Sequence, residues 1–225
     1  MKNDNRPSGA GKTTAALFDL DGVVVDTEPQ YSKFWREQAA KYLPDIPDFD
    51  MRIKGRTLKE IFRRHFGGRA EVQEHIRAAL ADFEANMTFE YIPGVADYVK
   101  DLRAHGVRTA IVTSSDNHKI AALKRSKPEI DGLFEDFITA ERITRSKPDP
   151  EGYLLGAEVL GVEPENSFVM EDAFTGMEAG RAAGMRVVGL STTFPAEELA
   201  DKADAVIPDF RGFSYDRLMQ IRYTR

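Results

Sequence analysis

The stretch AALFDLDGVVVDTE (residues 15–28) opens with a short apolar run and then breaks into acidic residues and a glycine. Because such a run is too short for a buried helix, we predict a buried strand over residues 15–20. Gly22 ends this strand, since glycine allows the chain to turn. Asp19 and Asp21 are therefore expected where the first strand of the fold leaves its sheet.

Short apolar runs separated by helical stretches continue along the chain. We predict strands at residues 15–20, 109–113, 136–139, 167–170, 186–190 and 205–207. Helical periodicity covers residues 95–105, 118–125, 150–160, 174–183 and 196–201, with Gly106, Gly161 and Gly184 as stops. This alternation is typical of an α/β protein with an open, Rossmann-like parallel sheet.

One block interrupts the alternation. Residues 29–92 contain no convincing strand, only helical stretches at 30–43, 58–66 and 70–87. Pro29 opens the first of these helices, and Pro93-Gly94 ends the block. Because the block is too long for a connection, we predict a small all-helical domain at 29–92, inserted into a core formed by residues 13–28 and 93–225.

Polar residues follow several of the predicted strands. The first strand ends in Asp19 and Asp21, the second in Thr113-Ser114-Ser115, and the fourth in Glu171-Asp172. Lys147 lies in SKPDP, where the prolines fix the backbone and so aim the amine. Ligands of open α/β sheets bind beyond the carboxyl ends of the strands. These side chains are therefore expected to converge at one edge.

Each of these signals has an ordinary structural explanation when it is taken alone. Asp and Gly frequently form turns, and a Thr-Ser-Ser segment often caps a helix. Their order and their placement at successive strand ends favour a functional site instead. Crowded carboxylates repel one another unless a hard cation lies among them, and an oxygen-only site with a lysine suits Mg²⁺ and a phosphate.

The arrangement resembles the haloacid dehalogenase superfamily, and within it the phosphatases and β-phosphoglucomutases with a helical cap domain inserted after the first strand. The resemblance covers about residues 14–207 and rests on four motifs. These are FDLDGVVVDTE, Thr113 in TAIVTSS, Lys147 in SKPDP, and VMEDAFTG with Glu171 and Asp172.

The resemblance implies a role for each motif. Asp19 would be the nucleophile that takes up the phosphoryl group, and Asp21 the general acid and base. Thr113, Ser114 and Ser115 would hold phosphate oxygens, the Ser114 backbone N–H among them. Lys147 would neutralise charge. The implied Mg²⁺ ligands are Asp19, the Asp21 carbonyl, Asp172 and, as a further candidate, Glu171. Such charge neutralisation is what a carboxylate needs before it can attack an anionic phosphoryl group.

The cap is expected to close over the site and select the substrate. The loop KGRT (54–57) is its best candidate, so Lys54, Gly55 and Arg56 are predicted to bind substrate. The chain departs here from the phosphoglucomutases that it resembles. Tyr31 stands where those mutases carry a histidine, and Leu58 aligns with an arginine that follows their cap glycine.

The segment SGAGKTTA (8–15) is similar to the phosphate-binding loop of nucleotide triphosphatases, which raises the alternative of a nucleotide kinase. In the full pattern GxxxxGK[ST], however, Arg6 stands where the first glycine belongs. No strand is predicted before the loop and no helix after it. We therefore interpret residues 1–12 as a disordered or expression-derived leader.

Composition excludes several classes of function. With 31 Lys and Arg against 37 Asp and Glu, the net charge of −6 disfavours nucleic-acid binding. The sequence has neither a long apolar run nor the apolar core of a signal peptide, which predicts a cytoplasmic protein outside the membrane. Without cysteine there is no disulfide, thiolate zinc site or catalytic thiol. The histidines fit no ligand pattern; they are His65, His75, His105 and His118.

Together these observations predict a Mg²⁺-dependent phosphatase that hydrolyses a small phosphorylated metabolite, a sugar phosphate in the leading hypothesis, as a monomer or weak dimer. A sugar phosphomutase and an inorganic pyrophosphatase would use the same core and stay open as alternatives. A non-catalytic phosphate-binding or protein-interaction module is a further alternative, against which the intact pair Asp19 and Asp21 argues.

Overall fold

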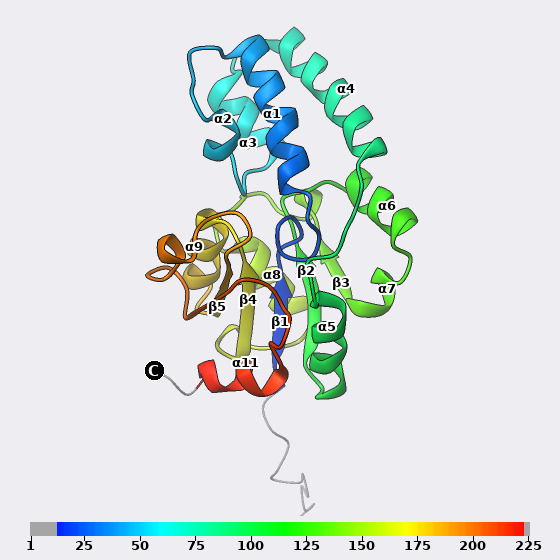
Figure 1. Ribbon diagram of the computed structural model, residues 1–225, viewed down its shortest axis with the longest axis vertical. Helices are drawn as coiled ribbons and strands as arrows, with labels where there is room; N and C mark the ends of the chain where they lie inside the picture. Colours follow the sequence, from blue (N-terminus) through cyan, green and yellow to red (C-terminus); the bar gives the residue numbers. More distant parts are fainter. Residues whose placement is uncertain (1–12, 223–225) are drawn as a thin grey trace, which may run out of the picture.

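The computed structural model describes residues 13–222. It shows a sheet with helices on both faces and a helical region beyond one end of the strands (Figure 1). The proposed leader, residues 1–12, lies outside the described residues, as do Gly11 and Lys12 of the nucleotide-loop segment. Both interpretations of that segment therefore stay predictions from the sequence.

All strands of the sheet run parallel, which confirms the predicted α/β core. They are β1 (Ala15–Phe18), β2 (Arg108–Val112), β3 (Asp136–Ile138), β4 (Ser167–Glu171), β5 (Arg186–Leu190) and β6 (Ala205–Ile207). The order is β3-β2-β1-β4-β5-β6. The chain therefore winds in one direction from β1 to β3 and in the other from β4 to β6. The crevice between β1 and β4, where the direction changes, is the usual ligand site of such a sheet.

Successive residues of the central strands point to opposite faces of the sheet and pack into two separate apolar layers, as the two-residue period of a strand requires. Ala16 and Phe18 of β1 face a layer covered by α5 (Val95–Ala104), α6 (Asn117–Ser126), α7 (Ile130–Leu133) and α11 (Tyr215–Arg222). Ala15 and Leu17 face the opposite layer, covered by α8 (Glu151–Val159), α9 (Phe174–Ala182) and α10 (Ala196–Leu199). Because both faces are buried, the strands read as continuous apolar runs.

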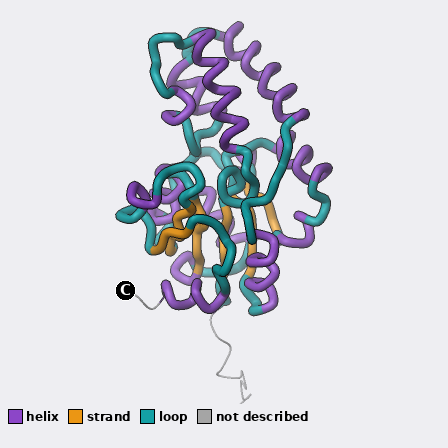
Figure 2. Tube along the Cα trace, in the orientation of Figure 1, coloured by secondary structure: helices purple, strands orange, loops and turns teal. Residues whose placement is uncertain are grey.

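The helical region consists of α1 (Glu28–Tyr42), α2 (Phe49–Arg52), α3 (Leu58–His65) and α4 (Ala70–Asn86). It has an apolar core of its own, in which Phe34, Trp35, Phe49, Ile61 and Phe66 are buried. Figure 2 shows the strands gathered below this region, with helices and loops alone above them. We call it the cap. Its exact boundaries, 29 and 92, stay a prediction.

The two chain crossings between core and cap lie side by side. Val25 and Tyr91 form an antiparallel bridge. The Asp26 N–H donates to the Glu90 carbonyl at 2.8 Å, and the Ile92 N–H donates to the Val24 carbonyl at 3.0 Å. The cap is thus tethered to the core by a narrow two-stranded neck directly beside the end of β1.

The prediction of only three cap helices is wrong, because α2 adds a fourth. Four further elements were not predicted from the sequence: α7, α11 and the 3-10 helices η1 (Ala140–Arg142) and η2 (Pro164–Asn166). Apart from α11, the unpredicted elements span about one turn or less, which is too short for a 3.6-residue period to become visible. None of the helices within residues 13–222 is long and apolar enough to cross a membrane.

Candidate active site

The predicted site residues of the core do meet at the carboxyl ends of the central strands. Asp19 directly follows β1, and its N–H donates to the Met170 carbonyl of β4 at 3.0 Å. Thr113 follows β2, and Glu171 is the last residue of β4. The parallel register of the sheet therefore brings residues far apart in the sequence to one edge, as the sequence predicted.

Lys147 is the electrostatic centre of this edge. Its ammonium lies 2.5 Å from Asp19 Oδ1 and 2.7 Å from Glu171 Oε1, and it donates to the Val112 carbonyl at 3.1 Å. Burial by itself lowers the pKa of Lys147, but the carboxylates of Asp19 and Glu171 outweigh burial and raise it above its ordinary value. Lys147 therefore stays charged and offsets the negative charge of the site.

Glu171 uses both carboxylate oxygens within the protein. Oε1 accepts from Lys147 and from the Tyr153 hydroxyl, each at 2.7 Å. Oε2 accepts from the backbone N–H groups of Asp172 and Ala173, each at 3.1 Å. A Cβ at Gly176 would lie 1.7 Å from Oε1, so α9 can approach only because this residue is glycine. No pattern in the sequence indicated this arrangement.

Three carboxylates are crowded together beside Lys147. Oxygen atoms of Asp19, Glu171 and Asp172 all lie within 4.8 Å of one another. Burial, opposed by Lys147 and reinforced by Glu171 and Asp21, raises the pKa of Asp19 to about 7. Burial and the neighbouring carboxylates of Glu171 and Asp19 also raise the pKa of Asp172 well above its ordinary value. Such an oxygen-only cluster fits a hard divalent cation, which would relieve the mutual repulsion.

Asp21 has hydrogen-bond and ion-pair partners that differ from those of Asp19. Its Oδ1 contacts the Thr27 hydroxyl and the Lys119 ammonium, and its Oδ2 accepts from the Ser115 hydroxyl at 3.0 Å. Burial alone would raise the pKa of Asp21, but Lys119 and the two hydroxyls lower it below its ordinary value. Asp19 and Asp21 thus lie in opposite electrostatic environments although they are two residues apart.

Gly22 makes this separation possible. It has φ 76°, which is accessible to glycine at little cost. A Cβ at this position would lie 2.1 Å from Asp172 Oδ2. The turn after Asp21 and the close approach of Asp172 both therefore require glycine, although the strand itself already ends at Phe18, before Gly22.

The hydroxyl residues after β2 divide their contacts between core and cap. The Ser115 N–H donates to Thr113 Oγ1 at 3.0 Å, which closes a tight turn. The Ser114 hydroxyl donates to the Gly55 carbonyl of the cap at 3.1 Å. All three residues line the cavity described next.

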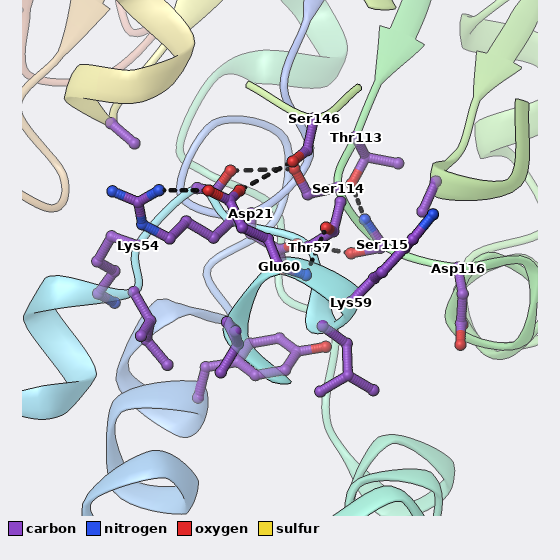
Figure 3. Close-up of a pocket in the computed structure, with 18 of the residues that line it drawn as sticks. Asp21, Lys54, Thr57, Lys59, Glu60, Thr113, Ser114, Ser115, Asp116 and Ser146 are labelled. Atoms are coloured by element: carbon purple, nitrogen blue, oxygen red, sulfur yellow. Dashed lines mark hydrogen bonds and ion pairs between the residues drawn. The ribbon is translucent and has the colours of Figure 1, made fainter. Parts of the chain in front are cut away.

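A cavity of about 470 Å³ lies between core and cap. Core residues Asp19, Asp21, Thr113, Ser114, Ser115 and Asp172 line it from one side, and cap residues Lys54, Gly55 and Arg56 line it from the other. Figure 3 shows Thr113, Ser114 and Ser115 facing the cap helix that carries Lys59 and Glu60. The predicted core and cap residues therefore border the same space, which is large enough for a small metabolite.

The two cap cations differ in how they are held. The Lys54 ammonium contacts the Glu28 carboxylate and donates to the Ser32 hydroxyl at 3.1 Å. Burial, opposed by Asp172 and Asp21, lowers the pKa of Lys54 to about 8. Arg56 instead pairs with Glu60 at 2.7 Å, and Glu60 also accepts from the Ser146 hydroxyl of the core at 2.9 Å. Of these two cap cations, Lys54 is therefore the one whose charge interacts with the carboxylates of Asp172 and Asp21.

Four further residues around this cavity had no role assigned to them from the sequence. Lys119 and Thr27 contact Asp21, while Tyr31 and Glu84 of the cap are joined by a 2.6 Å hydrogen bond. The position of Lys119 could have drawn attention to it. It is the third residue of a helix, where the positive end of the helix dipole disfavours a cation unless a nearby carboxylate compensates it.

This fold and this strand-edge cluster of acids and lysine define a class of α/β hydrolytic enzymes with a helical cap. Residues 13–184 match the family model of the haloacid dehalogenase-like hydrolases, and the chain belongs to this family. The predicted resemblance is thereby confirmed, and the chain is an enzyme of this hydrolase type.

Relatives and solved structures agree with the assignment. Hexitol phosphatase A of Escherichia coli is 33% identical over 189 residues, covering 78% of this chain and 82% of that protein. Validoxylamine A 7'-phosphate phosphatase of Streptomyces hygroscopicus is 34% identical over 204 residues, covering 86% and 92%. The crystal structure of a beta-phosphoglucomutase from Clostridium difficile matches with a TM-score of 0.74 and 26% identity over 93% and 97% of the chains.

Proposed function

We propose that this enzyme is a Mg²⁺-dependent phosphatase that hydrolyses a small phosphorylated sugar or polyol through an aspartyl-phosphate intermediate on Asp19. The observation that carries the proposal is the contact of Lys147 at 2.5 Å with Asp19, a residue that lines the cavity between core and cap. A buried carboxylate held by a buried cation at a strand end suits attack on an anionic group.

The first step transfers the phosphoryl group to Asp19. A carboxylate oxygen of Asp19 attacks phosphorus as the bond between phosphorus and the ester oxygen breaks. Asp21 must be protonated for this step, although Lys119 and two hydroxyls favour its ionised form before the substrate binds. It gives its proton to the leaving oxygen, while Thr113 and the Ser114 backbone N–H orient the phosphoryl oxygens. Lys147 keeps its charge and offsets the negative charge that gathers on these oxygens.

The second step returns the enzyme to its starting state. Asp21, now ionised, takes a proton from water, and the resulting hydroxide attacks phosphorus. The bond between phosphorus and the Asp19 oxygen breaks, which releases inorganic phosphate and the free carboxylate. The hydroxyls of Ser115 and Thr27 contact the Asp21 carboxylate and hold it in both steps.

Asp19, Asp172 and the Asp21 carbonyl are the residues that we propose to hold Mg²⁺. Glu171 already accepts four hydrogen bonds within the protein, so we assign it to the orientation of Lys147 and of the loop at Asp172. When bound, the cation would neutralise the crowded carboxylates and the phosphoryl oxygens.

The names of the relatives support a phosphorylated carbohydrate-like substrate, since one is a hexitol phosphatase and another a phosphatase of validoxylamine A 7'-phosphate. The cavity volume of about 470 Å³ accommodates a molecule of that size. We propose a cytoplasmic enzyme that acts as a monomer or weak dimer.

A sugar phosphomutase is the second candidate, favoured by the structural match to a beta-phosphoglucomutase. It would use the same first step and then pass the phosphoryl group to a sugar hydroxyl instead of water. Supplying β-glucose 1-phosphate with a trace of the bisphosphate separates the two by phosphorus NMR. Glucose 6-phosphate accumulating over many turnovers for each phosphate released would establish the mutase.

The phosphatase proposal is tested by screening the purified protein against hexitol phosphates, sugar phosphates and pyrophosphate with Mg²⁺. Asp19→Asn is the matched control, because it keeps the shape of the side chain while it removes the attacking oxygen. We expect turnover of a sugar or polyol phosphate by the wild type alone. Turnover by Asp19→Asn near the wild-type rate would identify another nucleophile, and turnover of pyrophosphate alone would establish the pyrophosphatase alternative.

A further inference from the structure

Lys119 is a fully buried lysine that the chemistry above leaves without a role of its own. It lies in the first turn of α6, with 0% of its side chain exposed. A buried ammonium is costly unless a carboxylate compensates it. The one carboxylate in ion-pair contact with it among residues 13–222 is Asp21, the proposed general acid and base.

The ammonium completes a three-sided clamp on the Asp21 carboxylate. Lys119 and Thr27 contact Oδ1, and Ser115 donates to Oδ2 at 3.0 Å. These donors come from α6, from the loop after β1 and from the loop after β2. Rotation of the carboxylate would break contacts on both oxygens, so its direction is fixed by the surrounding side chains.

The cap covers the other side of Lys119. The ammonium lies 4.3 Å from the centre of the Tyr31 ring, and the Tyr31 hydroxyl donates to Glu84 at 2.6 Å. Tyr31, Glu84 and Asp116 line the cavity together with Asp21. An aromatic face attracts a desolvated cation. Tyr31 of the cap therefore stabilises the ammonium in the position where it meets Asp21.

We propose that Lys119 is a positioning residue for Asp21: together with Tyr31 of the cap it holds the carboxylate in the direction needed for proton exchange with the substrate oxygen and with water. The inference rests on the proposed phosphatase function. It assigns Lys119 to the proton-transfer steps, so that loss of the ammonium lowers kcat and leaves KM nearly unchanged.

The first test compares Lys119→Met with Lys124→Met, a lysine of the same helix that pairs with Asp131 near the surface. For a hexitol phosphate, whose alkoxide needs a proton to leave, we expect kcat of Lys119→Met to fall by about 10²-fold or more, the usual contribution of general acid catalysis. KM of Lys119→Met should stay close to that of the wild type, and Lys124→Met should have the kcat and KM of the wild type. An unchanged kcat in a folded Lys119→Met would overturn the proposal.

A second substrate resolves the two steps. Nitrophenolate leaves without a proton, so p-nitrophenyl phosphate should phosphorylate Lys119→Met at close to the wild-type rate in a rapid-quench experiment. Hydrolysis of the aspartyl phosphate still needs Asp21 and should be slow. A burst of nitrophenol followed by slow turnover supports positioning of Asp21. An equal loss in both phases would point to general disruption of the site and contradict the proposal.

A double-mutant cycle keeps the inference testable even if Lys119→Met alone is unstable. Asp21→Asn is compared with Asp21→Asn/Lys119→Met, which removes both charges together, and thermal unfolding checks that each variant folds. If Lys119 acts through Asp21, the second change adds no further loss in kcat. Losses that multiply would overturn the inference. If the wild type hydrolyses no phosphate ester, the proposed function itself fails, which is a separate outcome.

Discussion

The two sides of the cavity are built differently. On the core side, Asp19, Thr113 and Asp172 each come directly after a strand of the parallel sheet. On the cap side, Lys54 and Arg56 lie in a loop between two helices. The core residues are fixed by backbone register and by hydrogen bonds from Lys147 to Asp19, from Ser115 to Thr113 and from Thr193 to Asp172. The cap residues reach the cavity only because the cap is seated on the core.

Three core hydroxyls mark where the cap is seated. Ser114 donates to the Gly55 carbonyl at 3.1 Å, Thr175 to the Lys54 carbonyl at 3.5 Å, and Ser146 to the Glu60 carboxylate at 2.9 Å. The two bonds to backbone carbonyls contribute about 1 kcal/mol each, and the bond to the Glu60 carboxylate contributes about 1.5–3 kcal/mol. We therefore propose that the core side carries the chemistry and that the cap side selects the substrate. Changes on the core side should abolish turnover, and changes on the cap side should alter substrate affinity.

The largest expected effect is removal of the divalent cation. Chelation should abolish turnover, and Mg²⁺ should restore it, because the carboxylates of Asp19 and Asp172 otherwise repel both one another and the substrate. Mg²⁺ should also raise the melting temperature of the wild type, because binding at a hundredfold excess over Kd adds about 2.7 kcal/mol to the free energy of unfolding.

Asp172→Asn provides the decisive variant for this prediction, with the exposed Asp97→Asn of α5 as its control. The first should lose the Mg²⁺-dependent rise in melting temperature, and the second should keep it. Full turnover in chelator would show that the acidic cluster works without a cation.

A smaller effect is expected from Gly176→Ala in the core. The added Cβ would lie 1.7 Å from Glu171 Oε1, so the carboxylate and the Lys147 that it orients must shift. A displacement of this kind costs about 10²-fold in rate. Gly132→Ala in α7, where a Cβ meets nothing within 4 Å, is the matched control. Steady-state kinetics of the two variants make the measurement, and equal activity would show that Glu171 does not orient the site.

The smallest effect belongs to the cap. Lys54→Ala should raise KM about tenfold, equivalent to about 1.4 kcal/mol, with a smaller change in kcat. Burial lowers the pKa of Lys54 to about 8, so the ammonium is present below pH 8 and is lost as the pH rises through that value. KM of the wild type should therefore rise above pH 8, where the phosphate ester, with its second pKa of about 6, is already fully ionised.

Lys54→Arg is the control for this prediction, because an arginine stays charged throughout this range. Its KM should stay level from neutral pH to pH 9. A wild-type KM that is equally level would contradict a role for the Lys54 charge in binding.

The core side was predictable from the sequence for a physical reason. Short apolar runs specify the strands, and a parallel sheet places all of their carboxyl ends at one edge. Asp19, Thr113 and Asp172 could therefore be assigned to one site from their positions in the sequence. The strand end at Phe18 in place of Leu20 shifts the boundary without moving Asp19 from that edge.

Other features depend on contacts that leave no periodic trace in the sequence. The pairing of Arg56 with Glu60 leaves Lys54 as the cap cation with the stronger influence on the acidic cluster, and a loop motif alone could not distinguish them. Lys119 meets Asp21 across 98 residues of sequence. The one-turn helix α2 is held by burial of Phe49 in the cap core and not by its own propensity.

The most direct test of the proposed mechanism is to look for the phosphoryl group on Asp19. The enzyme is mixed with Mg²⁺ and excess hexitol phosphate, quenched in acid during turnover, digested and analysed by mass spectrometry. We predict one phosphoryl group on the peptide that contains Asp19, absent in Asp19→Asn and accumulating in Asp21→Asn with p-nitrophenyl phosphate. A protein that releases phosphate at full rate while every quenched sample lacks a phosphorylated Asp19 peptide would contradict the mechanism.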